Sequence, residues 1–306
     1  MSFDVVDLFA GGGGFSTAAR DAGCNVLWAA NHNEVAVKYH GLNHPMVKVI
    51  CQDLHQANWD DVPAHDLMLA SPCCQGHSKA AGVYNRSKKA DASRSTAWAP
   101  VSNLEVNQPE FGIIENVTDF KRWSLYGVWT EALRVLGYSV SEHIIDLADL
   151  GVPQSRVRLF VVLSRSKNPI ILDLPKLTHI PARTILDLNH ENYEWDHVSN
   201  RVEATQRRVA NGRNKYGNLF LDAAYGNERG GRDIGAPLGT VKTVNVHSLV
   251  KGNYIRPLTI AELARAQSFA DDYIWPEGKV ITKSLIGNAV PPRGGKVIIE
   301  ALLKAA

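Results

Sequence analysis

Short apolar runs alternate with amphipathic stretches over the first half of the chain. Each run is brief and is followed by a turn or by a helical pattern, which is typical of buried strands separated by helices. This alternation predicts an open α/β fold. The predicted strands cover residues 3–9, 25–30, 47–51, 66–70 and 111–117, and the predicted helices cover 16–22, 34–42 and 123–136.

The pattern continues through two more strands and then weakens. Between about 167 and 250 short apolar pieces alternate with Asn, Gly, Arg and His, which predicts a smaller, loop-rich domain with a basic face. Farther on, Thr259 and Glu262 have the spacing of a capping box at the start of a helix. The remaining predictions are strands 138–145 and 158–164, a turn at 286–292, a last helix at 295–303, and three units over 1–166, 167–250 and 251–306, the last completing the first.

A run of glycines follows the first predicted strand. Ala10-Gly-Gly-Gly-Gly-Phe15 leads into a helix that Gly23 closes. Strand, glycine turn and helix together are typical of a nucleotide-type cofactor loop, where the backbone approaches the ligand closely. Taken alone, the loop is compatible with a dinucleotide or with S-adenosylmethionine, and a merely flexible turn is the plainer alternative.

Two later strand ends carry polar residues that suit the same ligand. Asn31 occupies the position at which many such folds have an acid for the ribose hydroxyls. Asp53 ends the third strand, and its carboxylate can accept a hydrogen bond from an adenine amino group. Capping of the next segment is an equally good explanation of Asp53.

Two adjacent cysteines follow the predicted strand 66–70, within Ser71-Pro-Cys-Cys-Gln-Gly-His-Ser78. They lie at the carboxyl end of the sheet, where open α/β folds hold their sites. A thiolate there can act as a nucleophile. Packing in the core is the plainer explanation of a cysteine, but the flanking Pro72 and Gly76 favour an active site.

A basic stretch follows the cysteines, over residues 79–95. It has no core-forming period, so we expect a mobile loop. A solvated run of charge is the usual explanation, but its position favours phosphate contact and closure over a substrate. Its basic residues are Lys79, Arg86, Lys88, Lys89 and Arg94.

Further charged residues lie at the ends of later strands. Glu115 and Asn116 end the strand 111–117, which puts a carboxylate at the same sheet edge as Cys74. Arg156 and Arg158 alternate at the start of another strand, so both point to one face. Paired arginines on one face can hold an anion or a carbonyl oxygen.

Composition limits the kinds of binding partner and of cellular compartment that we expect for this protein. The net charge is only +2, so a polyanion must meet a local basic surface. The four cysteines show neither a disulfide framework nor a zinc pattern, so we expect a reducing compartment and no bound metal. No signal peptide or membrane-spanning run is evident, so we expect a soluble intracellular protein with no membrane partner.

Six motifs in order resemble those of the DNA (cytosine-5) methyltransferases, over nearly the whole chain. The match is specific because the order is kept, although each motif alone would be weak. The motifs are Asp7-Leu-Phe-Ala-Gly-Gly-Gly-Gly-Phe15, Pro72 to Ser78, Glu115-Asn-Val117, Gln154-Ser-Arg-Val-Arg158, Arg256-Pro-Leu-Thr259 with Glu262, Arg265, Gln267 and Phe269, and Gly287-Asn-Ala-Val-Pro-Pro292.

The resemblance implies a Rossmann-like, S-adenosylmethionine-dependent α/β methyltransferase with a mixed, mostly parallel sheet and a small, loop-rich target-recognition domain over 167–250. It implies that Cys74 adds to C6 of a flipped-out cytosine in double-stranded DNA, that Glu115 contacts N3, and that Arg158 contacts the base with support from Arg156. S-adenosylhomocysteine would be the product. Residues implied at the cofactor are Phe9, Ala10, Gly11, Gly13, Asn31, Asp53, Pro72, Asn288 and Ala289.

Three residues depart from the family pattern. Cys73 stands where the family has Pro, and because Pro72-Cys73 also makes a Pro-Cys pair, Cys73 is the alternative nucleophile. The spacing to the downstream Gln, Gly and Ser favours Cys74. His77 replaces an aromatic or small apolar residue, and Asn31 replaces the ribose-binding acid.

The alternatives are a catalytically silent DNA-binding relative and a relative that methylates RNA. Both Glu115 and Arg158 are retained, which argues against a silent relative, and the long arginine-containing recognition segment favours duplex DNA. A nicotinamide dehydrogenase would not need Cys74 and Glu115 together with the Gln154 motif. We expect a monomer in the cytoplasm of a prokaryotic or phage-infected cell, associated with the nucleoid, with a restriction enzyme as a functional partner but not in a stable complex.

Overall fold

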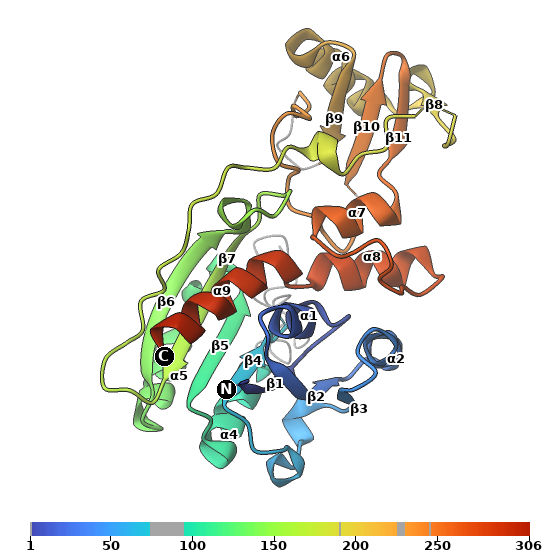
Figure 1. The fold of residues 1–306 in the computed structure, drawn as a ribbon. Helices are drawn as coiled ribbons and strands as arrows, with labels where there is room; N and C mark the ends of the chain where they lie inside the picture. Colours follow the sequence, from blue (N-terminus) through green and yellow to red (C-terminus); the bar gives the residue numbers. More distant parts are fainter. Residues whose placement is uncertain (1, 74–94, 190, 225–229, 245) are drawn as a thin grey trace.

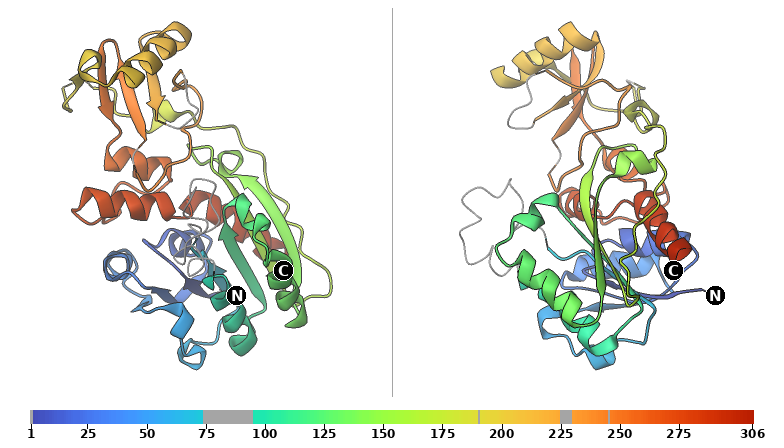
Figure 2. Two further views of the ribbon diagram at one scale, coloured as in Figure 1. Left: turned by 180° about the vertical axis from the view of Figure 1, so that it is seen from behind. Right: turned by 90° about the vertical axis from the view of Figure 1, so that its left-hand side faces the viewer.

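The chain folds into two lobes, each built on its own β-sheet (Figure 1). The computed structural model describes residues 2–73, 95–189, 191–224, 230–244 and 246–306. Helices α7, α8 and α9 lie where the lobes meet, and the last of them runs back along the larger lobe (Figures 1 and 2). Within the described ranges, no helix combines the length and the apolar character that a membrane span requires.

The larger lobe contains a seven-stranded sheet in the order β3-β2-β1-β4-β5-β7-β6. The pairings among β1 to β5 are parallel, whereas β7 runs antiparallel to both β5 and β6. This confirms the predicted mixed, mostly parallel α/β sheet. The strands are β1 (Asp4–Leu8), β2 (Asn25–Asn31), β3 (Lys48–Cys51), β4 (Leu67–Ala70), β5 (Phe111–Asn116), β6 (Ser139–Asp146) and β7 (Val157–Ser164).

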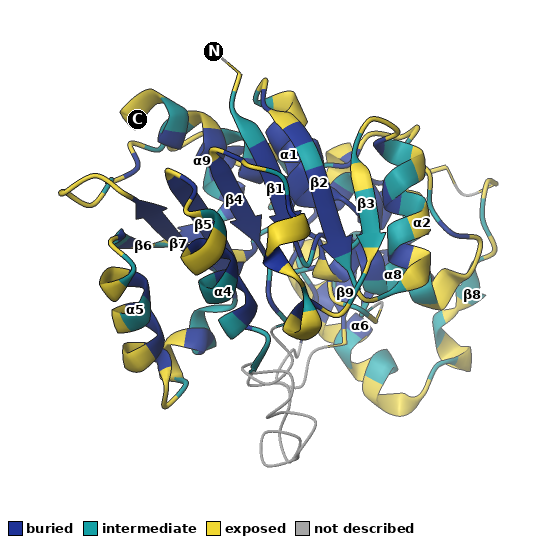
Figure 3. Cartoon of the chain, turned by 90° about the horizontal axis from the view of Figure 1, so that it is seen from below, coloured by how far each residue is buried: buried dark blue, intermediate teal, exposed yellow. Residues whose placement is uncertain are grey.

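Helices cover both faces of this sheet, which explains why the central strands read as continuous apolar runs. Strands β4 and β5 are buried along their length, and β1 is buried beyond its first residue (Figure 3). Apolar residues of α1 and α9 pack on one face, and those of α4 and α5 pack on the other. The helices of this lobe are α1 (Gly14–Asp21), α2 (Glu34–Asn43), α4 (Trp98–Asn107), α5 (Tyr126–Val135) and α9 (Pro292–Ala305).

The smaller lobe is a four-stranded antiparallel sheet in the order β8-β11-β10-β9. Val209 of helix α6 packs with Phe220, Val250 and Ile255 of this sheet. Helices α7 and α8 share another apolar cluster with residues of the lobe. The bounds are β8 (Asp196–His197), β9 (Leu219–Ala223), β10 (His247–Lys251), β11 (Tyr254–Pro257), α6 (Glu203–Tyr216), α7 (Ile260–Ala266) and α8 (Lys279–Asn288).

The segment 167–250 is more regular than the loop-rich domain that the sequence predicts. Helix α6 has 14 residues, yet only Val209 and Gly212 are buried, so no apolar stripe marks it in the sequence. Residues Ile286 to Asn288, predicted as a turn, end helix α8 instead. The capping box is confirmed: Thr259 and Glu262 cap α7 reciprocally. The three ranges 1–166, 167–250 and 251–306 stay a prediction.

Candidate active site

The carboxyl ends of β1, β2, β4 and β5 meet at one edge of the large sheet. Hydrogen bonds join the chain just beyond these strands: Ala10 N–H donates to Ala30 O at 3.0 Å, and Ser71 N–H donates to Leu8 O at 3.1 Å. The Asn116 side-chain amide donates to Pro72 O at 3.1 Å. Predicted site residues from the ends of four separate strands therefore lie along one edge.

The glycine turn after β1 adopts a tight, left-handed backbone. Phe9, Gly11 and Gly13 have φ values of 59°, 53° and 89°. For Phe9 this conformation carries strain, and such strain concentrates at functional sites. Gly14 must be glycine, since a Cβ there would lie 2.3 Å from Val290 O. The backbone of this turn is therefore tightly constrained, and a half-exposed aromatic residue, Phe9, lies at its start.

A polar cluster that the sequence analysis missed supports the glycine turn from behind. The Tyr273 hydroxyl donates to Gly12 O, and His44 Nε2 lies 3.0 Å from Thr17 Oγ1. Burial, aided by the Arg20 charge, lowers the pKa of His44 to about 4, and burial also raises the pKa of Tyr273 beyond its ordinary range. These groups are neutral near pH 7. Their positions give no common signal in the sequence, because Thr17 lies within α1, His44 follows α2 and Tyr273 lies in a segment without regular structure.

Asp7 is a fully buried carboxyl group below the glycine turn. Ser16 Oγ donates to its Oδ2 at 2.7 Å. Its Oδ1 atom has no hydrogen-bond partner among the described residues. Burial raises the pKa of Asp7 to about 7, against a smaller lowering by Ser16. Asp7 therefore stays partly protonated near neutral pH.

The polar residues at the ends of β2 and β3 are already engaged in local turns. Asn31 Oδ1 accepts a hydrogen bond from Asn33 N–H at 3.0 Å. Asp53 caps the short helix η1 (Leu54–Gln56) and accepts from His55 N–H at 3.0 Å, which confirms the capping explanation. Its side chain is still 57% exposed, and hydrogen bonds from His55 lower its pKa. A charged, accessible carboxylate therefore lies at this strand end.

Two more predicted cofactor residues lie at the end of α8. Asn288 is exposed, whereas Ala289 is buried against the glycine turn. A Cβ at Gly14 would lie 3.2 Å from the Ala289 Cβ. The closing motif therefore packs on the glycine turn, although nearly the whole length of the sequence separates the two.

Glu115 and Arg158 form a largely buried ion pair at the end of β5. Arg158 Nε lies 3.1 Å from Glu115 Oε1, and the side chains are 14% and 9% exposed, respectively. Burial raises the pKa of Glu115, although Arg158 and then Arg156 act to lower it. A carboxyl group with a raised pKa can donate as well as accept a proton, which suits acid–base work.

Arg156 is 2% exposed, and its guanidinium points to backbone carbonyls. Nη1 donates to Val241 O at 3.1 Å, and Nη2 donates to Gly287 O at 3.0 Å. Nearby, the Gln154 Oε1 atom accepts from Val241 N–H at 2.8 Å. Arg156 and Gln154 thus join the large sheet to the segment before β10 and to α8.

The cysteine motif is only partly described. Cys73 is half-buried, and its N–H donates to Thr96 Oγ1 at 3.1 Å. Cys74, the predicted nucleophile, and the basic segment 79–94 lie outside the described residues, as does His77. Pro72 is within the described residues. Its carbonyl oxygen accepts the hydrogen bond from Asn116, which lies on β5 next to Glu115.

Two adjacent arginines of α6, Arg207 and Arg208, differ in their surroundings. Arg208 donates from Nε and Nη2 to the two carboxylate oxygens of Asp222 at 2.9 and 3.0 Å. Arg207 is 71% exposed and lies 3.9 Å from Glu203. Arg208 therefore holds α6 on β9, whereas the charge of Arg207 stays exposed.

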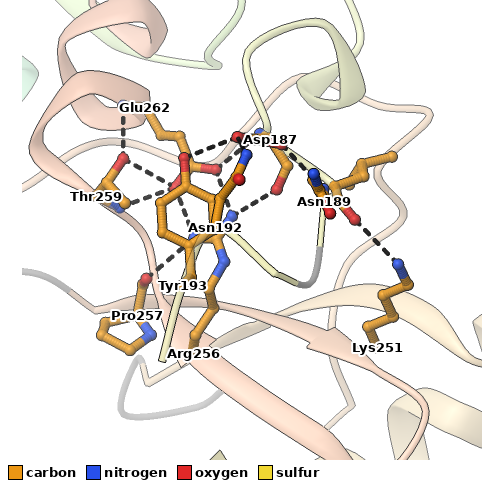
Figure 4. A network of polar contacts seen from close by, with 10 residues as sticks. Asp187, Asn189, Asn192, Tyr193, Lys251, Arg256, Pro257, Thr259 and Glu262 are labelled. Atoms are coloured by element: carbon orange, nitrogen blue, oxygen red, sulfur yellow. Dashed lines mark hydrogen bonds and ion pairs between the residues drawn. The ribbon is translucent and has the colours of Figure 1, made fainter. Parts of the chain in front are cut away.

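The motif that begins at Arg256 organises the base of the smaller lobe (Figure 4). Arg256 and Glu262 are almost fully buried and pair at 2.7 Å. Arg256 also donates to Asp187 O at 2.7 Å and lies over the Tyr193 ring, 4.2 Å from its centroid. These contacts join three segments, and none of them leaves Arg256 accessible for a ligand.

Comparison with known proteins agrees with this arrangement. A family model described as C-5 cytosine-specific DNA methylase matches residues 3–304. Type II methyltransferase M1.HphI of Haemophilus parahaemolyticus is 29% identical, covering 99% of this chain and 87% of its own sequence. Type II methyltransferase M.DdeI of Desulfomicrobium norvegicum is 27% identical, covering 98% and 88%.

Solved structures share the fold. The S. pombe Dnmt2 methyltransferase superimposes with a TM-score of 0.69 at 19% identity, covering 99% of each chain. The Entamoeba histolytica methyltransferase EhMeth gives a TM-score of 0.69 at 18% identity, covering 99% of this chain and 98% of its own. At this level of identity the likeness extends to the fold alone.

Proposed function

The chain belongs to the C-5 cytosine-specific DNA methylase family and is a DNA cytosine-5 methyltransferase, and from this premise we propose how its residues act. The substrate is a cytosine flipped out of double-stranded DNA, because C5 and C6 are not accessible within a stacked duplex. The observation that carries the proposal is the buried Glu115–Arg158 pair beside the tethered Pro72.

The residues at the sheet edge fit S-adenosylmethionine as the methyl donor. The glycines of the turn after Phe9 suit close approach of the backbone to a ligand, and Asp53 keeps an accessible carboxylate for an adenine amino group. When bound, the cofactor supplies an electrophilic methyl group, with S-adenosylhomocysteine as the product. The residues proposed to hold it are Phe9, Ala10, Gly11, Gly13, Asn31, Asp53, Pro72, Asn288 and Ala289.

Cys74 is proposed to supply the nucleophile, with Cys73 as the alternative. Its thiolate adds to C6 of the cytosine, and electron density moves toward N3, where the Glu115 carboxyl group donates a hydrogen bond. The raised pKa of Glu115 supports this role. C5 then accepts the methyl group, and loss of the C5 proton with departure of the sulfur restores the aromatic ring.

Arg158 is proposed to hold both Glu115 and the base, and Arg156 to support them from the backbone side. The ion pair limits rotation of the Glu115 side chain, so the carboxyl group is positioned before substrate binds. Arg156 also joins the two lobes, so its contribution to catalysis is one of placement.

The smaller lobe is proposed as the target-recognition domain, within residues 167–250. Exposed basic residues such as Arg207 suit the phosphate backbone of duplex DNA. The Type II names of the relatives support a role in restriction and modification. A monomeric cytoplasmic enzyme, in contact with the nucleoid and without a stable restriction-enzyme complex, remains our proposal for the cell.

The test is a methylation assay with the purified chain and radiolabelled S-adenosylmethionine. We expect label in duplex DNA, recovered as 5-methylcytosine after digestion, and none with a Glu115→Gln, Cys74→Ser double variant. Label in RNA but not in DNA would instead support an RNA-methylating relative. DNA binding without label in either polymer would support the silent relative.

A further inference from the structure

A chain of hydrogen bonds joins Asp53, His55 and Ser95 across 40 residues of sequence. His55 Nδ1 lies 2.8 Å from Asp53 Oδ1, and His55 Nε2 lies 2.8 Å from Ser95 Oγ. Asp53 follows the end of β3 at Cys51, and Ser95 precedes α4. The imidazole therefore spans the gap between the proposed adenine-binding carboxylate and a separate element of the large lobe.

The partners determine what each ring nitrogen does. An ionised carboxylate can only accept, so Nδ1–H of His55 must donate to Asp53. In the neutral ring Nε2 then accepts from the Ser95 hydroxyl. The same Asp53 oxygen also accepts from the His55 backbone N–H at 3.0 Å, so both hydrogen bonds fall on Oδ1. Neither of these two hydrogen bonds uses the other carboxylate oxygen, Oδ2, which can therefore accept from a ligand.

We infer that His55 is a positioning residue for the cofactor, which orients Asp53 toward the adenine amino group and is itself oriented by Ser95. The inference rests on the proposed cofactor site. Asp, His and Ser at these distances also occur in hydrolytic triads, but there the acid is buried, whereas Asp53 is 57% exposed. The exposed oxygen suits recognition of a donor rather than activation of Ser95.

The test compares S-adenosylhomocysteine with its deaminated analogue S-inosylhomocysteine, in which a carbonyl replaces the amino group. A carboxylate accepts from the amino group and repels the carbonyl, so the unaltered protein should prefer S-adenosylhomocysteine. Dissociation constants are measured by calorimetry for both ligands. His55→Ala should weaken S-adenosylhomocysteine about tenfold, as expected for a lost charge-assisted hydrogen bond, and bring the ratio of the two constants toward one.

Two further variants distinguish the contributions of the Asp53–His55 and His55–Ser95 hydrogen bonds. His55→Asn keeps a donor near the Nδ1 position but cannot reach Ser95, and Ser95→Ala removes the hydroxyl group that contacts Nε2. Both should lower the ratio by about threefold, less than His55→Ala, because Asp53 keeps its donor. His179→Ala is the matched control, since His179 Nε2 forms a similar exposed contact with Asp149 Oδ1 at 2.7 Å.

A change in folding alone would weaken both ligands equally and leave their ratio intact. An unchanged ratio in His55→Ala, with S-adenosylhomocysteine still bound by the unaltered protein, would overturn the role of His55 and leave the proposed function standing. If the unaltered protein binds neither ligand, the cofactor assignment itself is wrong, and the inference is overturned with it.

Discussion

Arg158 and Glu115 pair across two antiparallel strands, with Arg158 Nε 3.1 Å from Glu115 Oε1. In the register of β5 and β7, Glu115 faces Phe160, so Arg158 reaches it diagonally along the same face. Below this point the face is apolar, since Ile113, Phe160 and Val162 belong to the core. The sheet therefore places one ion pair where its apolar interior ends and the site begins.

Glu115→Gln tests the acid–base role of this pair. Gln keeps the shape and can still contact Arg158, so DNA affinity and thermal stability should change little. The rate of methylation should fall by about 10² to 10⁴, the usual contribution of a positioned acid or base. Single-turnover methylation and DNA binding measured on the same preparation check this. A variant with the original rate would show that Glu115 acts only by binding.

Adjacent arginines on α6 provide a matched pair of variants. Arg207→Ala removes an exposed charge, so it should leave stability unchanged and flatten the salt dependence of DNA binding by about one phosphate contact. Arg208→Ala leaves the buried carboxylate of Asp222 without its partner. It should lower the free energy of unfolding by on the order of 2 kcal/mol, less than for a fully buried pair because Arg208 keeps some exposure.

Urea unfolding and DNA binding at several salt concentrations distinguish the two variants. Equal stabilities would mean that the Arg208–Asp222 contact contributes little to folding. An unchanged salt slope in Arg207→Ala would mean that DNA meets another face of the smaller lobe.

Local patterns in the sequence were enough to predict the large sheet and several site residues. The strands of this sheet are apolar runs because helices cover both faces of the sheet. The spacing of Thr259 and Glu262 predicted the start of α7. The partners of Arg156 were not predictable, because Val241 and Gly287 are 85 and 131 residues away in sequence. Helix α6 was missed because its buried face offers too few apolar residues to give a period.

The same distinction applies to residues around the cofactor loop. The glycines and Asp53 are recognisable from their positions after strands. His55 and Tyr273 are not, because their roles depend on contacts with Ser95 and Gly12 that only the folded chain creates. Polar residues that support a site from behind have no fixed spacing to it.

Asp7 should make stability depend on pH. Its pKa is about 7 in the folded protein, against an ordinary value of 3.8, so folding takes up a proton between these values. The free energy of unfolding should therefore decrease as pH rises from about 4 to about 7. Asn does not ionise, so Asp7→Asn should not show this decrease. The free energy of unfolding of the variant should therefore rise relative to that of the unaltered protein over this range, by about 4 kcal/mol above pH 7.

Urea unfolding of both proteins between pH 4 and pH 8 measures the difference directly. Buried histidines such as His40 and His44 contribute a slope of the opposite sign, because burial lowers their pKa values. That slope is common to both proteins and cancels in the difference. Parallel stability curves would show that Asp7 ionises normally in the folded state.

Gly287 lies against the backbone of the segment that leads to β10. A Cβ there would lie 2.4 Å from the carbonyl carbon of Lys242 and 2.5 Å from Thr243 N, so Gly287→Ala must push α8 and this segment apart. We expect a loss of about 1 to 3 kcal/mol of stability from overpacking. Because Gly287 O also accepts from Arg156, we expect a raised KM for DNA.

Gly41→Ala is the control for Gly287→Ala. Gly41 lies within α2, and a Cβ at this position would meet no atom within 4 Å. Alanine there should raise stability by about 1 kcal/mol through helix propensity. Steady-state kinetics and thermal unfolding of both variants check the pair, and an unchanged KM in Gly287→Ala would separate lobe packing from DNA binding.

The adjacent cysteines can be separated by trapping the covalent intermediate. A duplex with 5-fluorocytosine at the target cannot lose its C5 substituent after methyl transfer, so the attacking sulfur stays bonded to C6. With Cys74 as nucleophile, Cys74→Ser should abolish both the adduct and methylation, since a hydroxyl is far less ionised than a thiol near neutral pH. Cys73→Pro should keep both.

The contacts of Cys73 make the second variant informative. Its N–H donates to Thr96 Oγ1 at 3.1 Å, and proline would remove that donor. Cys73→Pro should therefore lose about 1 kcal/mol of stability while it still forms the adduct. Thr96→Val, which removes the same hydrogen bond but keeps both sulfurs, controls for this loss. Mass spectrometry of the trapped peptide then decides: an adduct on Cys73 would make that residue the nucleophile and shift the whole motif by one position.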